Sequence, residues 1–228
     1  MIHSGSRNLG KQVADHYNKL AVKLNEKWYS SVEKKYELAF LPEDSEEGKS
    51  YIEEMEYCVD FAFANRKLMM KNVQECFYKN IYDAVDNIDC NFDPIINIAH
   101  NYASLENHFG HNVWVHRKGA TLARKGTIGI IPGSMGTKSY IVEGLGNPDS
   151  FMSCSHGAGR RMGRKEAIKR LDLEQEQEIM KDILGGPRSQ KELDESPSAY
   201  KDIQVVMENQ KDLVKILVEL TPLGVIKG

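Results

Sequence analysis

Residues 127–142 read Thr-Ile-Gly-Ile-Ile-Pro-Gly-Ser-Met-Gly-Thr-Lys-Ser-Tyr-Ile-Val. Two short runs rich in β-branched and aromatic residues, at 127–131 and 139–142, flank a centre rich in glycine and hydroxyl groups. That texture indicates two strands joined by a loop. Val113-Trp-Val115 predicts a further strand upstream. The middle of the chain, from about residue 95 to 155, is therefore predicted to be rich in strands.

Helical patterns lie on both sides of this middle region. Apolar residues recur every three or four positions from Leu9 onward, and a second helical region covers about 46–85, after the break at Pro42. Downstream, residues 163–182 and 200–220 also carry apolar residues at helical spacing. Helices flanking a strand-rich centre predict an α+β fold with a helical segment over about 9–85.

The composition is that of a globular protein of moderate size, with 228 residues, of which 28% are charged and 41% hydrophobic. No apolar run reaches the roughly 20 residues of a membrane span, and nothing in the sequence suggests secretion. The four cysteines show no close paired spacing, which favours a reducing, cytoplasmic compartment. The net charge of −3 does not indicate a nucleic-acid partner. Basic residues are nevertheless concentrated at 116–125 and 160–170, where phosphates could bind.

The stretch most informative about function is Ser153-Cys-Ser-His-Gly-Ala-Gly-Arg160. Its glycines allow backbone N–H groups to approach a ligand closely, and a following helix N-terminus favours negative charge. An imidazole such as His156 can meet a phosphate either as a nucleophile or as a metal ligand. A glycine turn with a surface histidine is the alternative interpretation of these eight residues.

Further histidines lie in loops upstream. His3-Ser-Gly-Ser-Arg7 combines an imidazole with a guanidinium, unless it is simply a disordered terminus. His100-Asn101 follows an apolar run, where the imidazole is either a metal ligand or a hydrogen-bonded structural residue. His108 and His111 lie in a polar turn and are predicted to be solvated.

Two more loops suit phosphate binding. In Val115-His-Arg-Lys-Gly-Ala120, basic residues precede a glycine at the end of a predicted strand. They are interpreted either as phosphate ligands or as a solvated run of charges. Pro132-Gly-Ser-Met-Gly-Thr137 could form a backbone cradle for phosphates or only a tight turn. Taken together, the imidazoles, cations and glycine loops indicate a polyphosphate substrate and a divalent metal. These loops contain neither a glycosidase-like carboxylate pair nor a Ser-His-Asp nucleophile elbow.

Seven strings, in the same order and across essentially the whole chain, resemble those of the RtcB-type RNA-splicing ligases, which join RNA ends using GTP and manganese. The strings are His3–Arg7, Ala99-His100-Asn101, Val115–Thr121, Pro132–Thr137, Ser153–Arg160, Asp194-Glu-Ser-Pro197 with Ala199-Tyr-Lys201, and Pro222–Gly228. The resemblance implies an RtcB-like mixed fold in which a strand-rich catalytic core is flanked by long helices. Residues 1–228 would be the C-terminal part of a single catalytic domain.

The resemblance also implies roles for individual residues. His156 matches the nucleophile that becomes guanylylated, and His3 and His100 match two manganese ligands. The surroundings of the GTP phosphates and ribose are matched by Asn101, Pro132, Gly133, Ser134, Met135, Ala158 and Gly159. Tyr200 and Lys227 match guanine contacts. RNA or triphosphate oxygens would be held by Arg7, Lys118 and Arg160.

The reaction implied by the resemblance starts from a 2′,3′-cyclic phosphate end, which is opened to a 3′-phosphate. GMP then moves from the histidine to that phosphate, and a 5′-hydroxyl attacks with release of GMP. The implied cofactor is Mn²⁺ (two ions in the complete family enzyme), with GTP as cosubstrate. The implied partners are RNA and an archease-like activator, without a membrane.

One departure from the family pattern is large. Family members are considerably longer and carry, upstream, an aspartate and a cysteine that bind manganese and a Gly-Asn-His-Phe stretch with a further metal histidine. None of these has a counterpart in this sequence, so we expect a truncated form with weak metal binding and little or no ligation on its own. A metal-dependent RNA-end phosphoesterase and a non-catalytic RNA-binding fragment remain the alternatives.

Overall fold

A computed structural model of the chain describes residues 1–82 and 92–227. The chain divides into two compact units, Met1–Tyr102 and Ala103–Gly228. Helices and antiparallel sheets occur together, which confirms the predicted α+β class. The assignment of residues 1–228 to one catalytic domain stays a prediction.

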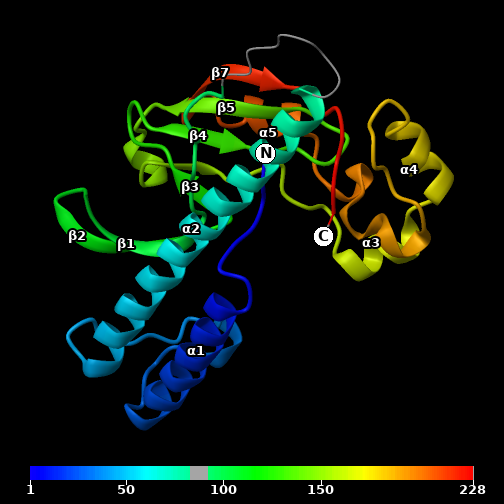
Figure 1. Cartoon of the computed structure of the whole chain (residues 1–228). Helices are drawn as coiled ribbons and strands as arrows, with labels where there is room; N and C mark the ends of the chain where they lie inside the picture. The colour runs from blue at the N-terminus through cyan, green and yellow to red at the C-terminus, as the bar shows by residue number, and fades with distance from the viewer. Residues whose placement is uncertain (83–91, 228) are drawn as a thin grey trace. The chain divides into compact units, whose positions relative to one another are not determined.

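The first unit is built on two helices, α1 (Leu9–Lys27) and α2 (Glu46–Tyr82), with a short 3-10 turn, η1 (Lys34–Tyr36), between them. The two helices pack against one another (Figure 1), and Tyr17 of α1 and Met55 of α2 are buried. The Tyr17 hydroxyl donates a 2.8 Å hydrogen bond to the Glu54 carboxylate. Both helices lie within the segment predicted to be helical, about 9–85; the last residues of that segment and Cys90 lie outside the described part of the chain.

The second unit contains three small sheets. Strand β1 (Asn101–His108), whose first two residues end the first unit, pairs with β2 (His111–Lys118), and β3 (Ala120–Leu122) pairs antiparallel with β6 (Ser153–Ser155). Strands β4 (Ile128–Ile131), β5 (Ser139–Gly144) and β7 (Val214–Leu220) form an antiparallel sheet in the order β4-β5-β7 (Figure 1). The buried core of this unit comprises Ala123, Ile131, Tyr140, Val142, Cys154, Ala158, Ile203, Met207 and Val214.

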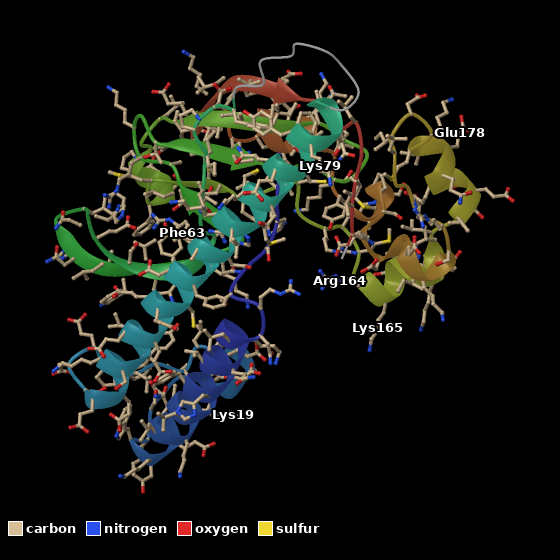
Figure 2. All side chains as sticks on the ribbon, viewed as in Figure 1. Lys19, Phe63, Lys79, Arg164, Lys165 and Glu178 are labelled. Carbon is tan, nitrogen blue, oxygen red and sulfur yellow. The ribbon has the colours of Figure 1, made fainter. Side chains whose placement is uncertain are left out.

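Short helices complete the second unit: η2 (Pro148–Ser150), α3 (Arg164–Arg170), α4 (Leu173–Ile179), η3 (Gln190–Glu195), η4 (Pro197–Ala199) and α5 (Ile203–Glu208). The single helix predicted over 163–182 is therefore two helices. The Asp172 carboxylate accepts a hydrogen bond from the Gln175 N–H and starts α4 as a new helix. Lys165 of α3 and Glu178 of α4 are exposed (Figure 2). No helix in the described part of the chain is both long and apolar enough to cross a membrane.

The predicted final helix over 200–220 is wrong. Helix α5 ends at Glu208, and Val214–Leu220 forms strand β7, in which Ile216 lies opposite Val142 of β5. The apolar residues of this segment recur at helical spacing, but several of them are β-branched, and β-branched residues also favour a strand. Residues 214–220 form a strand because they pair with the edge of β5 that β4 leaves open, and β5 is remote from them in sequence.

The prediction that His108 is solvated is also wrong, whereas His111 is exposed as predicted. His108 ends β1 and is buried, with its Nε2 atom 2.9 Å from the Glu106 carboxylate. Residues two apart on a strand face the same side, so these two side chains enter the interior together.

Candidate active site

The geometry around His156 is fixed by the β3–β6 ladder. Ala120 lies opposite Ser155, so Gly119, just before β3, faces His156, just after β6. The His156 Nδ1 atom lies 2.7 Å from the Gly119 carbonyl oxygen. A carbonyl oxygen can only accept, so Nδ1 carries the proton and the lone pair of the ring is on Nε2. An imidazole in this tautomer can act as a nucleophile through Nε2.

Gly119 supplies the backbone shape that turns its carbonyl toward the ring. Its φ of +79° lies in the left-handed region, which residues with a Cβ adopt at a cost. A Cβ built on it would meet the His156 ring only at 3.5 Å, an ordinary contact. The requirement for glycine at this position is therefore conformational, not one of space.

The histidine loop is joined to the loop that begins at Pro132. The Ala158 N–H donates to the Pro132 carbonyl at 2.9 Å, and a Cβ on Gly157 would lie 3.1 Å from the same oxygen. Gly157 thus allows the close approach of the two loops. The contact brings Ala158 and Pro132 together on the chain segments beside His156.

The 132–137 loop is closed on itself in this conformation. The Ser134 N–H donates to the Thr137 hydroxyl at 2.7 Å, the Gly136 N–H to the Ser134 hydroxyl at 3.3 Å, and the Gly133 N–H to the Ser139 hydroxyl at 3.2 Å. These amides would have to exchange their hydroxyl partners for phosphate oxygens to form a cradle. The phosphate-binding role of this loop stays a prediction, and in this conformation its amides are turned inward.

Arg160 is engaged within the protein. Its guanidinium lies over the Tyr200 ring, 5.0 Å from the centroid, and donates to the Tyr200 hydroxyl at 3.2 Å. It also contacts the Glu195 carboxylate at 3.1 Å and the Asp194 carbonyl oxygen. Its predicted role as a ligand of RNA or triphosphate oxygens stays a prediction.

Tyr200 and Glu195 are hydrogen-bonded and perturb one another. Burial, together with the hydrogen bond to the Glu195 carboxylate, raises the pKa of Tyr200 to about 12. Burial alone would raise the pKa of Glu195, but hydrogen bonds from Tyr200 and Arg164 outweigh it and lower that pKa. The tyrosine is therefore a neutral hydroxyl beside a carboxylate at any ordinary pH.

Lys227 reaches the same place from the end of the chain. Its Nζ atom lies 3.0 Å from the Asp194 carboxylate and 3.2 Å from the Glu192 carbonyl oxygen. The two residues predicted to contact guanine, Tyr200 and Lys227, thus converge on the adjacent residues Glu195 and Asp194 of η3. Asp194 and Glu195 lie in one of the family motifs, but the sequence gives no signal that they contact Tyr200 and Lys227.

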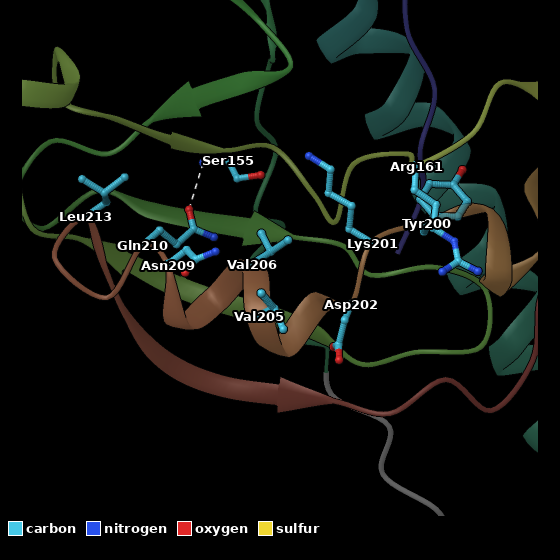
Figure 3. A pocket seen from close by; sticks show the side chains of 10 residues that line it. All are labelled: Ser155, Arg161, Tyr200, Lys201, Asp202, Val205, Val206, Asn209, Gln210 and Leu213. Atoms are coloured by element: carbon cyan, nitrogen blue, oxygen red, sulfur yellow. Dashed lines mark hydrogen bonds between the residues drawn. The ribbon is translucent and has the colours of Figure 1, made fainter.

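A pocket of about 560 Å³ lies next to the histidine loop. Figure 3 shows its lining, in which Val206 of α5 lies near the Lys201 side chain and Tyr200 lies beside Arg161. The Gln210 side chain accepts a 3.0 Å hydrogen bond from the Ser155 N–H, which ties this pocket wall to the strand before His156. The pocket therefore combines an apolar wall with cationic and amide groups.

The first unit brings His3 and His100 together. Their Nε2 atoms lie 3.3 Å apart and their rings meet edge to face. Arg66 of α2 holds the two segments in place, because it donates to the Ser4 carbonyl at 2.9 Å and to the Asn97 side chain at 2.7 Å. A helix residue that the sequence reasoning did not single out thus positions both predicted metal ligands.

The histidine pair fits two ligands of one cation. Two nitrogens each about 2.1 Å from a metal and at a right angle to one another would be about 3 Å apart, close to the observed spacing. In the described ranges 1–82 and 92–227, no group of three or more His, Cys, Asp or Glu residues is arranged around a metal position. As a possible metal site, the pair therefore offers two nitrogen ligands.

The remaining predicted residues lie on the surface of their own units. Arg7, with a φ of +57°, and Asn101 are exposed in the first unit, which also contains the exposed His3 and the half-buried His100. Lys118 is exposed at the end of β2, one residue before Gly119. Its neighbour Arg117, in contrast, is buried.

The family model described as tRNA-splicing ligase RtcB matches residues 1–228. The chain is similar over its whole length to the RNA-splicing ligase RtcB of Escherichia coli K12, at 39% identity and 55% of that protein. It is 34% identical to the tRNA-splicing ligase RtcB of Pyrobaculum aerophilum, with 52% of that protein covered. The chain belongs to the RtcB family of RNA-splicing ligases, as its motifs predicted. It spans about half the length of these relatives.

Proposed function

We propose that this chain carries the nucleotide-accepting part of a GTP-dependent RNA ligase that joins 2′,3′-cyclic phosphate or 3′-phosphate ends to 5′-hydroxyl ends. The proposal depends above all on the contact between His156 Nδ1 and the Gly119 carbonyl, which leaves Nε2 as the nucleophilic atom. Family membership and the names of the relatives support the reaction class.

In the first step, His156 Nε2 attacks the α-phosphorus of GTP. An N–P bond forms while the bond to the bridging oxygen breaks, and pyrophosphate leaves. The proton stays on Nδ1, and the Gly119 carbonyl that accepts its hydrogen bond stabilises the positive charge that develops on the ring, as a hydrogen-bond acceptor does for a catalytic histidine.

In the second step, the 3′-phosphate of RNA attacks the same phosphorus and the N–P bond breaks, which restores the imidazole. A 5′-hydroxyl then attacks the activated 3′-phosphate, and GMP leaves. Both transfers are in-line displacements in which orientation and charge neutralisation do most of the work.

The proposed binding groups are the residues that match the family's motifs. We assign the triphosphate and ribose to Asn101, Pro132, Gly133, Ser134, Met135, Ala158 and Gly159, and the guanine to Tyr200 and Lys227. Arg7, Lys118 and Arg160 would hold RNA or triphosphate oxygens. His3 and His100 would hold Mn²⁺, which supplies neutralisation of phosphate charge when bound. RNA as substrate, an archease-like activator and a cytoplasmic location belong to the same proposal.

The test uses this chain with GTP labelled in the α-phosphate and a high manganese concentration, since a pair of imidazoles holds the cation weakly. We expect a low yield of covalent label that acid removes and alkali does not, as for a phosphoramidate, and that His156→Ala abolishes. The E. coli relative serves as the positive control. Label that survives His156→Ala would refute the nucleophile assignment. Opening of a cyclic phosphate end without GTP would favour the phosphoesterase alternative instead.

A further inference from the structure

Arg117 is a buried arginine on β2, two residues before Gly119, and only 1% of it is exposed. It forms a bidentate ion pair with Glu106 of β1, with 2.5 Å between Nη1 and Oε1 and 3.1 Å between Nη2 and Oε2. The same carboxylate accepts hydrogen bonds from Ser104 and His108. A forked guanidinium matched to a carboxylate in this way has a fixed orientation.

The remaining donors of Arg117 reach the strand that carries His156. Its Nε atom donates to the Ser153 hydroxyl at 3.0 Å, and Nη2 donates to the Phe151 carbonyl at 3.0 Å. Ser153 begins β6, and His156 follows the end of that strand. One side chain therefore connects β2, which leads to Gly119, with β6, which leads to His156.

The segment before β6 needs such support. Phe151 and Met152 have φ angles of +53° and +50°, so two consecutive residues with side chains adopt the left-handed conformation. Residues with a Cβ rarely adopt this region, and a pair of them persists only where surrounding contacts hold it. The bond from Arg117 to the Phe151 carbonyl is one of these contacts.

We propose that Arg117, held by Glu106, is a positioning residue that keeps the His156 ring in the tautomer with the proton on Nδ1, by fixing β6 against the backbone of Gly119. The consequence for catalysis rests on the proposed function, since it requires His156 to be the nucleophile. The effect on the tautomer does not.

A lysine at position 117 would keep the charge but not the connection. A single ammonium group can stay with Glu106, but it lacks the planar fork that also reaches Ser153 and Phe151. The His156 ring should then exchange between its two neutral tautomers. Arg124→Lys is the matched control, because Arg124 approaches the same Glu106 carboxylate at 3.5 Å, is about half exposed and is hydrogen-bonded to neither Ser153 nor Phe151.

The experiment is long-range proton–nitrogen NMR on this chain, labelled with nitrogen-15 in its histidines, at a pH above 8, with His156→Ala to assign the signals. Wild type and Arg124→Lys should show His156 almost entirely as the Nδ1–H tautomer, and Arg117→Lys should show a mixture of both. A folded Arg117→Lys variant with the wild-type pattern would overturn the proposal.

If Arg117→Lys does not fold, Ser153→Ala decides the question, because it removes one acceptor of Arg117 without changing any charge. A mixed tautomer in Ser153→Ala supports the proposal, and an unchanged one overturns it. Where the wild-type chain accepts GMP, the variants should also slow that step about tenfold with little change in the KM for GTP. A chain that keeps the Nδ1–H tautomer but never accepts GMP would refute the proposed function and leave this inference standing.

Discussion

The His156 imidazole and the Gly119 carbonyl are joined by a 2.7 Å hydrogen bond across the end of the β3–β6 ladder. The ladder fixes the two backbones, and the left-handed φ of Gly119 turns the carbonyl toward the ring. The proton position in the ring is therefore set by main-chain geometry. This makes the backbone of residue 119 as important to the proposed chemistry as the histidine itself.

Gly119→Ala should lower the yield of guanylylated protein about tenfold and destabilise the fold by about 1–2 kcal/mol, because alanine adopts a φ of +79° at a cost. Gly110→Ala is the control. Gly110 has a φ of +80° and no atom within 4 Å of its built Cβ, so it carries the same backbone cost in the β1–β2 turn. Urea unfolding and labelling with GTP measure the two effects. Equal yields from both variants would show that the orientation of the Gly119 carbonyl does not matter.

Glu106→Gln should lower the free energy of unfolding at neutral pH by about 3 kcal/mol, since it leaves the Arg117 charge buried without its counter-ion. Glu219→Gln, which breaks an exposed pair with Lys138, should cost less than about 1 kcal/mol. Denaturant unfolding of both variants makes the comparison. Similar losses from the two substitutions would mean that the Glu106–Arg117 pair is not a dominant contact.

The same carboxylate predicts a pH dependence. Burial alone would raise the pKa of Glu106, but hydrogen bonds from Arg117, Ser104 and His108 outweigh it and hold that pKa well below 4.5. A lowered native pKa means that the stabilisation is present above about 4.5 and is lost as the pH falls toward the native value. The wild type should therefore lose stability between pH 5 and 3 more steeply than Glu106→Gln. Parallel curves for the two proteins would contradict this.

Arg66→Ala should weaken Mn²⁺ binding about tenfold, because it removes the hydrogen bonds that bring the segments of His3 and His100 together. Lys67→Ala, at an exposed neighbouring position, should leave binding unchanged. The electron paramagnetic resonance signal of free Mn²⁺ gives the bound fraction. Unaltered binding in Arg66→Ala, with loss in His3→Ala, would show that the helix residue does not position the pair.

The parts of the molecule with a strong local signal were predictable from the sequence. The periodicity of α1 and the β-branched runs of β4 and β5 are properties of the segments themselves. Strand β7 was not predictable in this way, because its helical spacing is overridden by pairing with β5, a segment remote in sequence. The local sequence pattern therefore determines the secondary structure of a segment only where pairing with a distant segment does not favour another structure.

The residues of the candidate site also differ in whether the local sequence could predict them. Motifs found His156, His3 and His100, and the structure brings the last two together. Arg117 lies in a basic run that is typical of a solvated surface, and its burial depends on Glu106 opposite it. The sequence did contain a signal for this burial. Glu106 and His108 are two residues apart on one strand and so share a face, which is typical of a buried polar group beside its partner.

The most direct test of the central claim is tandem mass spectrometry of this chain after incubation with GTP and Mn²⁺, under conditions that preserve a phosphorus–nitrogen bond. We predict a guanylate on the peptide containing Ser153–Arg160, with fragment ions that locate it on His156, and no adduct in His156→Ala. A guanylate on any other side chain, or none at saturating GTP and manganese while the E. coli relative is modified, would contradict it.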